Sequence, residues 1–253
     1  MPGREVVIAR YAEDVRWARD LPARVTVYNK GPDALPGAMP LPNVGLADHT
    51  FLHHILTRYD TLADFTVFTQ GRWDDHVPKN FHLRTLLEWA EDLCGAVLLT
   101  KMREWGPDGR LVHHGKWADD LAAGRLARAR LSLVDYFQTY LGVDLEYAGH
   151  LNYFPGSIFG ASARLIRKRP RRHYERLLET VSHHAQPEEA HYLERSWVYQ
   201  LASGKTKTRV ACIVKPEDVP APCQCGGNAE TTGSPTGRGL TGERCRNRHQ
   251  SGH

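Results

Sequence analysis

The sequence has no hydrophobic run long enough to cross a membrane. Its longest aliphatic runs, Val6–Ala9 and Ala96–Leu99, contain four residues each, whereas a membrane-spanning helix needs about 20 apolar residues. No apolar segment followed by a small-residue cleavage site stands near the start of the chain, so a secretory signal is not expected. These absences predict a cytoplasmic protein without a membrane span.

Cysteine is scarce and badly spaced for a disulfide scaffold. The chain has five cysteines, and Cys223, Cys225 and Cys245 all lie beyond residue 215. Together with His249 they could supply four zinc ligands, but a single residue separates the first pair, where zinc sites usually have about two to four. We favour an incidental cluster in a Gly-rich tail. From Pro216 onward large aliphatic residues are rare, which predicts a disordered Gly/Pro/Arg-rich tail over 216–253.

A large excess of charge is also absent. Lys and Arg number 33 against 29 Asp and Glu, a net charge of +4, so a nucleic-acid partner is unlikely on composition. The basic residues are concentrated in one segment, which we interpret as a solvated helix surface rather than a phosphate or nucleic-acid footprint. That segment contains Arg164, Arg167, Lys168, Arg169, Arg171, Arg172 and Arg176.

Three common catalytic motifs are missing from the strand and helix patterns of residues 1–215. No P-loop occurs, and the Gly-x-Gly-x-x-Gly match at Gly237–Gly242 lies in the Gly-rich tail rather than between a strand and a helix, which disfavours a nicotinamide enzyme and a P-loop kinase. The chain has no Gly-x-Ser-x-Gly nucleophile elbow either. A domain of short βα units could still hold a nucleotide through carboxylates and backbone amides.

The first 215 residues alternate between strand and helix patterns. Short β-branched or aromatic runs predict strands over 6–10, 25–28 and 64–69, and apolar periodicity predicts helices over 12–21 and 47–59. This order predicts a single α/β domain over 1–215, Rossmann-like, with a mostly parallel sheet flanked by helices. Further expectations are helices over 81–93, 121–141, 161–184 with a break at Pro170, and 188–202, a buried strand over 96–100 and an irregular stretch over 151–159.

Ligand sites of parallel sheets lie at the carboxyl ends of the strands, and this rule selects three loops. Tyr11, Glu13 and Asp14 follow the first strand, and Asn29 and Lys30 follow the second. The third loop carries Gln70, Trp73, Asp74, Asp75 and His76. Adjacent carboxylates and an imidazole are suitable ligands for Mg²⁺ or Mn²⁺ on a diphosphate. The alternative is a polar turn that caps the next helix. Trp73 could stack on a sugar or a base.

Several segments together carry a family resemblance. They are VVIARYAEDVRW (6–17), VTVYNKG (25–31), LPNVGLADHTFLHHILTRYDTLADFTVFTQG (41–71), FPGSIFGASARLIRKRP (154–170) and EEAHYLERSW (188–197). The chain resembles a widespread uncharacterised family of bacterial, fungal and plant proteins whose pattern runs ARYxED…W, YNKG, NVGRExxTYLxxI and YDxLxDxTxFxQG…DH. That family is similar in layout to GT-A glycosyltransferases, which transfer sugars from nucleotide-sugar donors.

The resemblance implies roles for particular residues. Arg10, Tyr11, Glu13 and Asp14 would border the nucleotide, and we add Asn29, Lys30, Asn43 and Gln70 to the donor-binding set. Asp74, Asp75 and His76 would hold a Mn²⁺ or Mg²⁺ ion on the donor diphosphate, with Asp75 also counted as catalytic. Glu194, or else Glu188 or Glu189, would accept the proton of the small-molecule or glycan acceptor. The alternative for Glu194 is a carboxylate paired with an arginine.

The chain departs from the pattern at two places. GT-A proteins have one residue between their two aspartates, whereas Asp74 and Asp75 are adjacent. The family's Arg-Glu after Asn-Val-Gly is replaced by Leu46 and Ala47, with Asp48 one position further on.

The departures leave two alternative functions open. One is a catalytically impaired nucleotide- or glycan-binding protein of the same fold. The other is a metal-dependent hydrolase that uses the same aspartates with His49 or His53, which stand one helical turn apart.

Overall fold

The computed structural model describes residues 3–76, 83–88, 95–96, 100–102, 104–149 and 151–201. The expected tail over 216–253, the domain boundary at 215 and the three tail cysteines lie outside these residues. Within the described ranges, no helix has the length and apolar character needed to span a bilayer.

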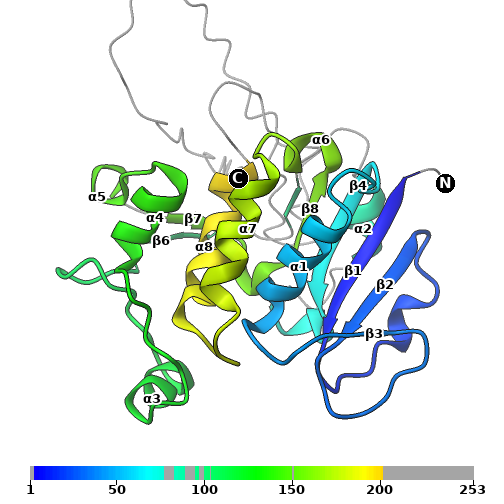
Figure 1. Cartoon of the computed structure of the whole chain (residues 1–253), viewed down its shortest axis with the longest axis horizontal. Coiled ribbons are helices and arrows are strands. Elements are labelled where there is room, and N and C mark those ends of the chain that lie inside the picture. The colour runs from blue at the N-terminus through cyan, green and yellow to red at the C-terminus, as the bar shows by residue number, and fades with distance from the viewer. Residues whose placement is uncertain are drawn as a thin grey trace, which may run out of the picture.

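A six-stranded sheet forms one side of the molecule (Figure 1), with strand order β3-β2-β1-β4-β8-β5. Its first four strands in this order are mutually parallel, β8 runs antiparallel to β4, and β5 runs antiparallel to β8. The expected α/β domain with a mostly parallel sheet is therefore confirmed. The strands are β1 (Arg4–Arg10), β2 (Arg24–Asn29), β3 (Met39–Pro40), β4 (Phe65–Gln70), β5 (Gly95–Ala96) and β8 (Phe159–Ser162).

Both faces of the sheet are covered. Successive residues of a strand point to opposite faces, so Val6 and Val7 of β1, opposite Val67 and Phe68 of β4, enter different hydrophobic clusters. One face packs against η1 (Arg16–Ala18) and α2 (Leu83–Glu88). The other face packs against the larger cluster, which includes α1 (Leu46–Thr57).

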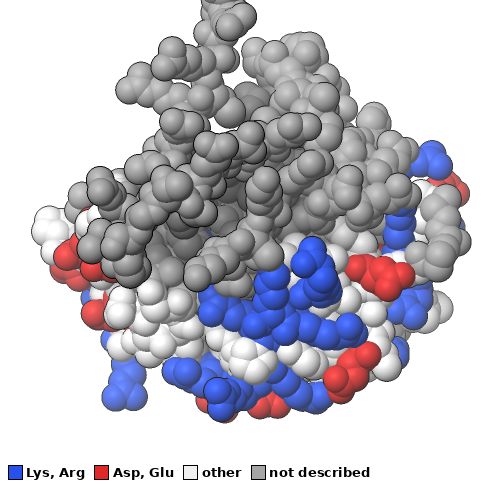
Figure 2. Space-filling view, turned by 90° about the horizontal axis from the view of Figure 1, so that it is seen from above, with Lys and Arg blue, Asp and Glu red and all other residues white. Residues whose placement is uncertain are grey.

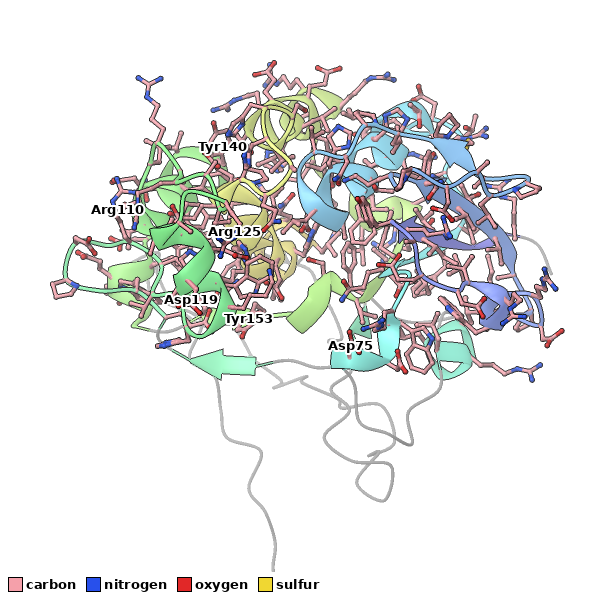
Figure 3. The ribbon with its side chains drawn as sticks, turned by 90° about the horizontal axis from the view of Figure 1, so that it is seen from below. Asp75, Arg110, Asp119, Arg125, Tyr140 and Tyr153 are labelled. Carbon is pink, nitrogen blue, oxygen red and sulfur yellow. The ribbon has the colours of Figure 1, made fainter. Side chains whose placement is uncertain are left out.

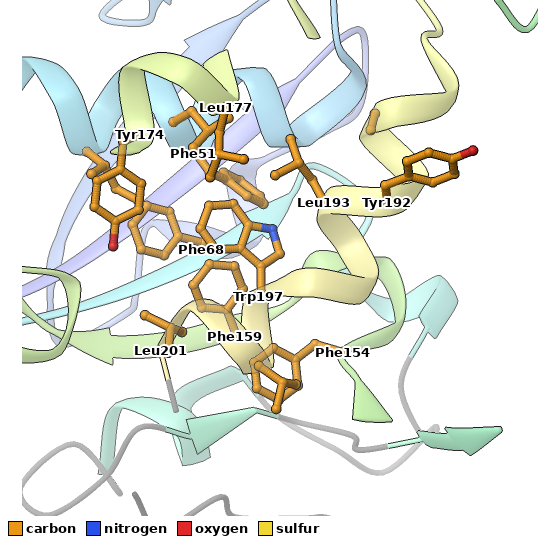
Figure 4. Close-up of a cluster of buried hydrophobic side chains, with 14 of the residues drawn as sticks. Phe51, Phe68, Phe154, Phe159, Tyr174, Leu177, Tyr192, Leu193, Trp197 and Leu201 are labelled. Atoms are coloured by element: carbon orange, nitrogen blue, oxygen red, sulfur yellow. The ribbon is translucent and has the colours of Figure 1, made fainter. Parts of the chain in front are cut away.

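The larger cluster joins segments far apart in the chain. Figure 4 shows Phe51 of α1, Phe68 of β4, Phe159 of β8 and Trp197 of α8 packed together. Their ring centroids lie 4.8–5.3 Å apart for the pairs Phe159–Trp197, Phe68–Phe159 and Phe51–Phe68. Burial of each such side chain contributes about 1.5–3 kcal/mol. This core fixes α1 and α8 (Glu188–Leu201) on the sheet.

The remaining elements lie beside α8, on the side away from the main sheet (Figure 1). They form a two-stranded antiparallel sheet with short helices around it. The elements are β6 (Thr100–Met102), β7 (Leu151–Tyr153), α3 (Lys116–Ala122), α4 (Leu133–Leu141) and α5 (Leu145–Ala148). Two short turns, η2 (Trp73–His76) and η4 (Pro155–Ser157), and two further helices, α6 (Ala163–Ile166) and α7 (Arg171–Val181), complete the described part.

Three expected elements differ from the structure. The helix expected over 12–21 is wrong, because Asp14 accepts from the backbone N–H of Arg16 at 2.9 Å and one 3₁₀ turn follows. The single helix over 121–141 is also wrong: α3 ends before Gly124, whose φ is +71°, and Ser132 caps a separate α4.

The buried strand over 96–100 divides between β5 and β6, which belong to different sheets. The expected break at Pro170 is confirmed, because this residue caps α7. Of the helix expected over 81–93, residues 83–88 are described and form α2.

Candidate functional site

A cavity of about 520 Å³ lies where the parallel strands end. Ala9 and Arg10 of β1, Gln70 at the end of β4, and Lys30 just after β2 all line it. The chain leaves β1 toward β2 on one side and returns to β4 on the other, so the cavity lies at the topological switch point where α/β sheets bind ligands. Its other lining residues are Tyr11, Glu13, Asn43, Leu46, Ala47, Asp48, Trp117, Gly156, Ser157, Ala185, Gln186, Ala190, His191 and Glu194.

Arg10 ties together the loops that follow β1 and β2. Its guanidinium donates to Asn29 Oδ1 at 2.7 Å, to Asp33 at 3.1 and 2.5 Å, and through Nε to the carbonyl oxygen of Glu13 at 2.8 Å. The hydrogen bond from Arg10 lowers the pKa of Asp33. Because Nε and both terminal nitrogens of the guanidinium already donate hydrogen bonds within the protein, we infer that Arg10 holds together the loops after β1 and β2. Asn29 supports it and is not among the lining residues.

The same loops approach each other closely. Glu13 Oε2 accepts from the backbone N–H groups of Tyr11 and Ala12, at 2.7 and 3.2 Å. A Cβ at Gly31 would lie 1.5 Å from the carbonyl oxygen of Tyr11, so only glycine allows this backbone approach. The rim of the cavity is therefore rigid at the ends of β1 and β2.

Lys30 is a buried cation in the cavity wall. Its side chain is 8% exposed, and Nζ donates to the carbonyl oxygens of Val44 and Leu46. Burial lowers the pKa of Lys30 to about 8, and the nearby Asp48 raises it. An ammonium group has three donors, so the two backbone bonds leave one N–H of Lys30 for a ligand.

Asp48 is the site residue that the sequence analysis did not include in the candidate site. It is 4% exposed, and its Oδ1 accepts from Ser157 Oγ at 3.0 Å and from Trp197 Nε1 at 2.6 Å. Burial, together with the negative charge of the nearby Glu194, raises the pKa of Asp48 to about 7. A signal existed: Asp48 precedes Phe51 and Leu52 by three and four residues, which places it on the buried face of α1.

Glu194 lines the cavity and is also paired. Its Oε1 accepts from the backbone N–H of Gly156 at 2.6 Å, and its Oε2 accepts from Arg195 at 2.9 Å. Arg195 is bound to Glu104 as well. Through its hydrogen bond with Gly156, Glu194 holds η4, and with it Ser157, beside Asp48. The alternative carboxylates lie elsewhere: Glu188 and Glu189 are not among the residues that line this cavity.

The structure does not bring Asp74 and Asp75 into the cavity. Both are exposed on η2, and Asp75 lies 3.8 Å from Arg72. In Figure 3 Asp75 lies at the lower edge of the ribbon, near the middle of the view. His76 ends η2, and its side chain lies outside the described part. Within the described ranges no three His, Cys, Asp or Glu residues form a group that could hold a metal.

Two other expected site residues also point elsewhere. Asp14 forms an exposed pair with Arg16 at 2.6 Å. Trp73 packs on Trp17 with ring centroids 6.0 Å apart. Neither lines the cavity.

The histidine pair of α1 lies behind the cavity. The rings of His49 and His53 stack 6.4 Å apart, and burial lowers the pKa of His49 to about 4. Neither residue lines the cavity. On the opposite wall, the rings of Trp117 and His191 lie 4.5 Å apart. These two rings give the cavity an aromatic wall.

The basic segment lies at the other end of the molecule. Figure 2, seen from above, shows Lys and Arg side chains gathered on the upper face, whereas the cavity is at the carboxyl ends of the strands. Arg167 donates to the carbonyl oxygens of Tyr59 and Asp60 beyond α1, and Arg169 donates to those of Tyr199 and Gln200 in the last turn of α8. These contacts give two of the cations a helix-capping role.

No protein-family model, curated protein or solved structure matches the chain. The resemblance to the uncharacterised family therefore stays a prediction from sequence motifs. The structure itself defines an α/β protein with a cavity at the switch point of its sheet.

Proposed function

We propose that the cavity binds a nucleoside-diphosphate sugar and that the protein, as a GT-A-like glycosyltransferase, transfers the sugar to a small-molecule or glycan acceptor. One observation carries the proposal: a buried ammonium group and a buried carboxylate, Lys30 and Asp48, line one cavity at the switch point of a mostly parallel sheet. Such cavities bind nucleotides through the loops after the strands. The motif resemblance in the same loops supports this ligand class.

Lys30 is suited to the donor diphosphate. A buried cation with two backbone partners is held in place, and in a cavity of low dielectric its charge acts more strongly on an anion than it would in water. Its pKa of about 8 leaves it mostly protonated at neutral pH, and a bound diphosphate would raise that pKa further. Lys30 would therefore stabilise the negative charge that develops on the leaving nucleotide.

Asp48 is better placed than Glu194 to accept a proton. A general base works best when its pKa lies near the working pH, and that of Asp48 is about 7. Both oxygens of Glu194 accept hydrogen bonds, whereas the two bonds to Asp48 both reach Oδ1. We assign the proton acceptor to Asp48 and the positioning of η4 to Glu194.

The proposed step is a single displacement. The acceptor hydroxyl oxygen forms a bond to the anomeric carbon, its proton passes to Asp48, and the bond from that carbon to the diphosphate oxygen breaks. The electron pair leaves with the nucleoside diphosphate beside Lys30. Each part of this step is assigned to the residues of the chain itself.

A second candidate, a binding protein of the same fold without turnover, has its own observation. Leu46 and Ala47 line the cavity where the resembling family has Arg and Glu. With aliphatic side chains at these two positions, the cavity lacks the cation and the carboxylate that the family pattern would provide for contact with the ligand. Robust hydrolysis of a nucleotide sugar by the unmodified chain would eliminate this candidate, and activity gained only by the double variant Leu46→Arg/Ala47→Glu would favour it.

Isothermal titration calorimetry with a panel of nucleoside diphosphates tests the proposed function, with and without Mn²⁺. We expect at least one diphosphate to bind, and Lys30→Met to weaken it by about tenfold or more, which corresponds to about 1.4 kcal/mol. Lys168→Met, at the basic end of the molecule, is the matched control and should bind normally. Circular dichroism checks that both variants fold. Absence of binding by every diphosphate would refute the proposal.

A further inference from the structure

A second cavity, of about 410 Å³, lies between α4, α7 and the start of α8. It shares no lining residue with the first cavity. Tyr136 and Tyr140 of α4 line it together with Thr180 of α7 and Glu189 of α8. Its volume is within the range of small-molecule sites, which is roughly 300–1,000 Å³.

One carboxylate oxygen in the wall of this cavity has no hydrogen-bond partner among the described residues. Glu189 is 9% exposed, yet its Oε2 forms no hydrogen bond there. Tyr136, which is 1% exposed, has its hydroxyl beside the side chain of Thr180, and the Thr180 hydroxyl donates to the carbonyl oxygen of Leu177 at 2.7 Å. Since more than about 90% of buried polar groups are hydrogen-bonded, the unpartnered Glu189 oxygen indicates a missing partner.

The neighbouring carboxylate shows that the fold can satisfy a buried glutamate at this helix terminus. Glu188 is fully buried, and its two oxygens contact His113 Nε2 at 3.0 Å and the backbone N–H of Ala129 at 2.8 Å. Glu189, one position later, keeps an unpartnered oxygen. The unpartnered oxygen is therefore a feature of the cavity wall and not of the helix terminus as a whole.

The chemistry of the Glu189 carboxylate defines the partner. An ionised carboxylate only accepts hydrogen bonds, so the partner of Glu189 must donate, and a positive charge would compensate its buried negative charge. The rings of Tyr136 and Tyr140, 4.6 Å apart, provide an apolar wall beside it. The Tyr140 ring already carries a cation on one face, since the guanidinium of Arg176 lies 5.1 Å from its centroid.

We propose that this second cavity is a binding site for a small organic molecule with a primary ammonium group and an apolar body. The ammonium donates to Glu189 Oε2 and to Tyr136 Oη, and the apolar body lies against the two tyrosine rings. The exposed Glu179 and His183 at its edge leave the ligand a path from solvent. The site is independent of the sugar-transfer proposal.

Calorimetric titration of the full chain with benzylammonium and with benzyl alcohol tests the site, because these probes have nearly the same shape and differ in charge. We expect the ammonium probe to bind at least about tenfold more tightly than the alcohol. Glu189→Gln should remove this preference. Glu175→Gln, which alters an exposed carboxylate of α7, is the matched control and should leave it unchanged.

Tyr136→Phe gives a second readout that does not depend on the charge of Glu189. It removes a hydroxyl that lies beside the side chain of Thr180, so it should destabilise the fold by only about 1 kcal/mol, and it should weaken benzylammonium several-fold. Equal affinity for the two probes, no binding of either, or an unchanged preference in Glu189→Gln would overturn the proposal and indicate that the Glu189 oxygen binds water. None of these results would bear on nucleotide binding in the first cavity.

Discussion

Replacing Asp48 by Asn should make the protein more stable above neutral pH. Burial raises the pKa of this carboxyl from 3.8 to about 7, so between these values the folded state binds more protons than the unfolded state. The stabilisation that Asp48 contributes to the free energy of unfolding is therefore fully present below about pH 4 and is lost as the pH rises to about 7. The loss approaches about 4 kcal/mol at about pH 8, at roughly 1.36 kcal/mol for each unit of pKa difference.

The variant should recover part of that energy. Asn keeps a carbonyl oxygen that can accept from Ser157 and Trp197, but its amide brings two donors into a buried site, at a cost of about 1–3 kcal/mol. The expected net gain for Asp48→Asn is therefore roughly 1–3 kcal/mol at about pH 8. At about pH 4 the wild type should be the more stable protein, because its carboxyl is neutral there and the cost of the amide remains.

Urea unfolding followed by tryptophan fluorescence at several pH values measures this difference. The free energy of unfolding of the wild type should fall relative to that of the variant as the pH rises. Asp74→Asn, which changes an exposed carboxylate, is the control and should follow the wild type. Parallel pH profiles for Asp48→Asn and the wild type would refute the argument, because Asp48 would then titrate alike in both states.

Three further predictions concern the rim of the first cavity. Gly31→Ala should lower the free energy of unfolding by roughly 2–4 kcal/mol in a urea titration, because its Cβ would meet the carbonyl oxygen of Tyr11; a variant as stable as the wild type would contradict the close approach. Asp33→Ala should cost only about 1 kcal/mol in the same assay, since this half-exposed partner of Arg10 is well hydrated; a loss several times larger would mean that Arg10 depends on it alone. Leu46→Arg should tighten calorimetric binding of a nucleoside diphosphate about tenfold by adding a cation to the cavity; unchanged affinity would place Leu46 away from the phosphates.

The sheet could be predicted where its signals are local. Strands β1, β2 and β4 have β-branched or aromatic residues bounded by polar ones, and the structure has them within about two residues of the expected bounds. The rule that parallel sheets bind ligands at their carboxyl ends then located the loops. Helix α3 and helix α4 could not be separated in this way, because periodicity alone does not show the positive φ of Gly124.

The centre of the first cavity depends on contacts that no local pattern shows. Asp48 and Trp197 are 149 positions apart in the chain, and their hydrogen bond exists only because α1 and α8 pack on the same face of the sheet. Asp74 and Asp75 carried the stronger sequence signal, yet they lie on an exposed turn. The residue types therefore predicted an acidic site at the carboxyl ends of the strands, whereas long-range packing decided which carboxylate is buried there.

The late antiparallel strand β8 has a consequence for synthesis of the chain. It pairs with β4 and with β5, so the edge of β4 stays open on the ribosome until Phe159–Ser162 has emerged. An open strand edge can pair with another chain, and distant pairings form slowly. Nascent chains that stall before this strand are expected to aggregate and to depend on chaperones.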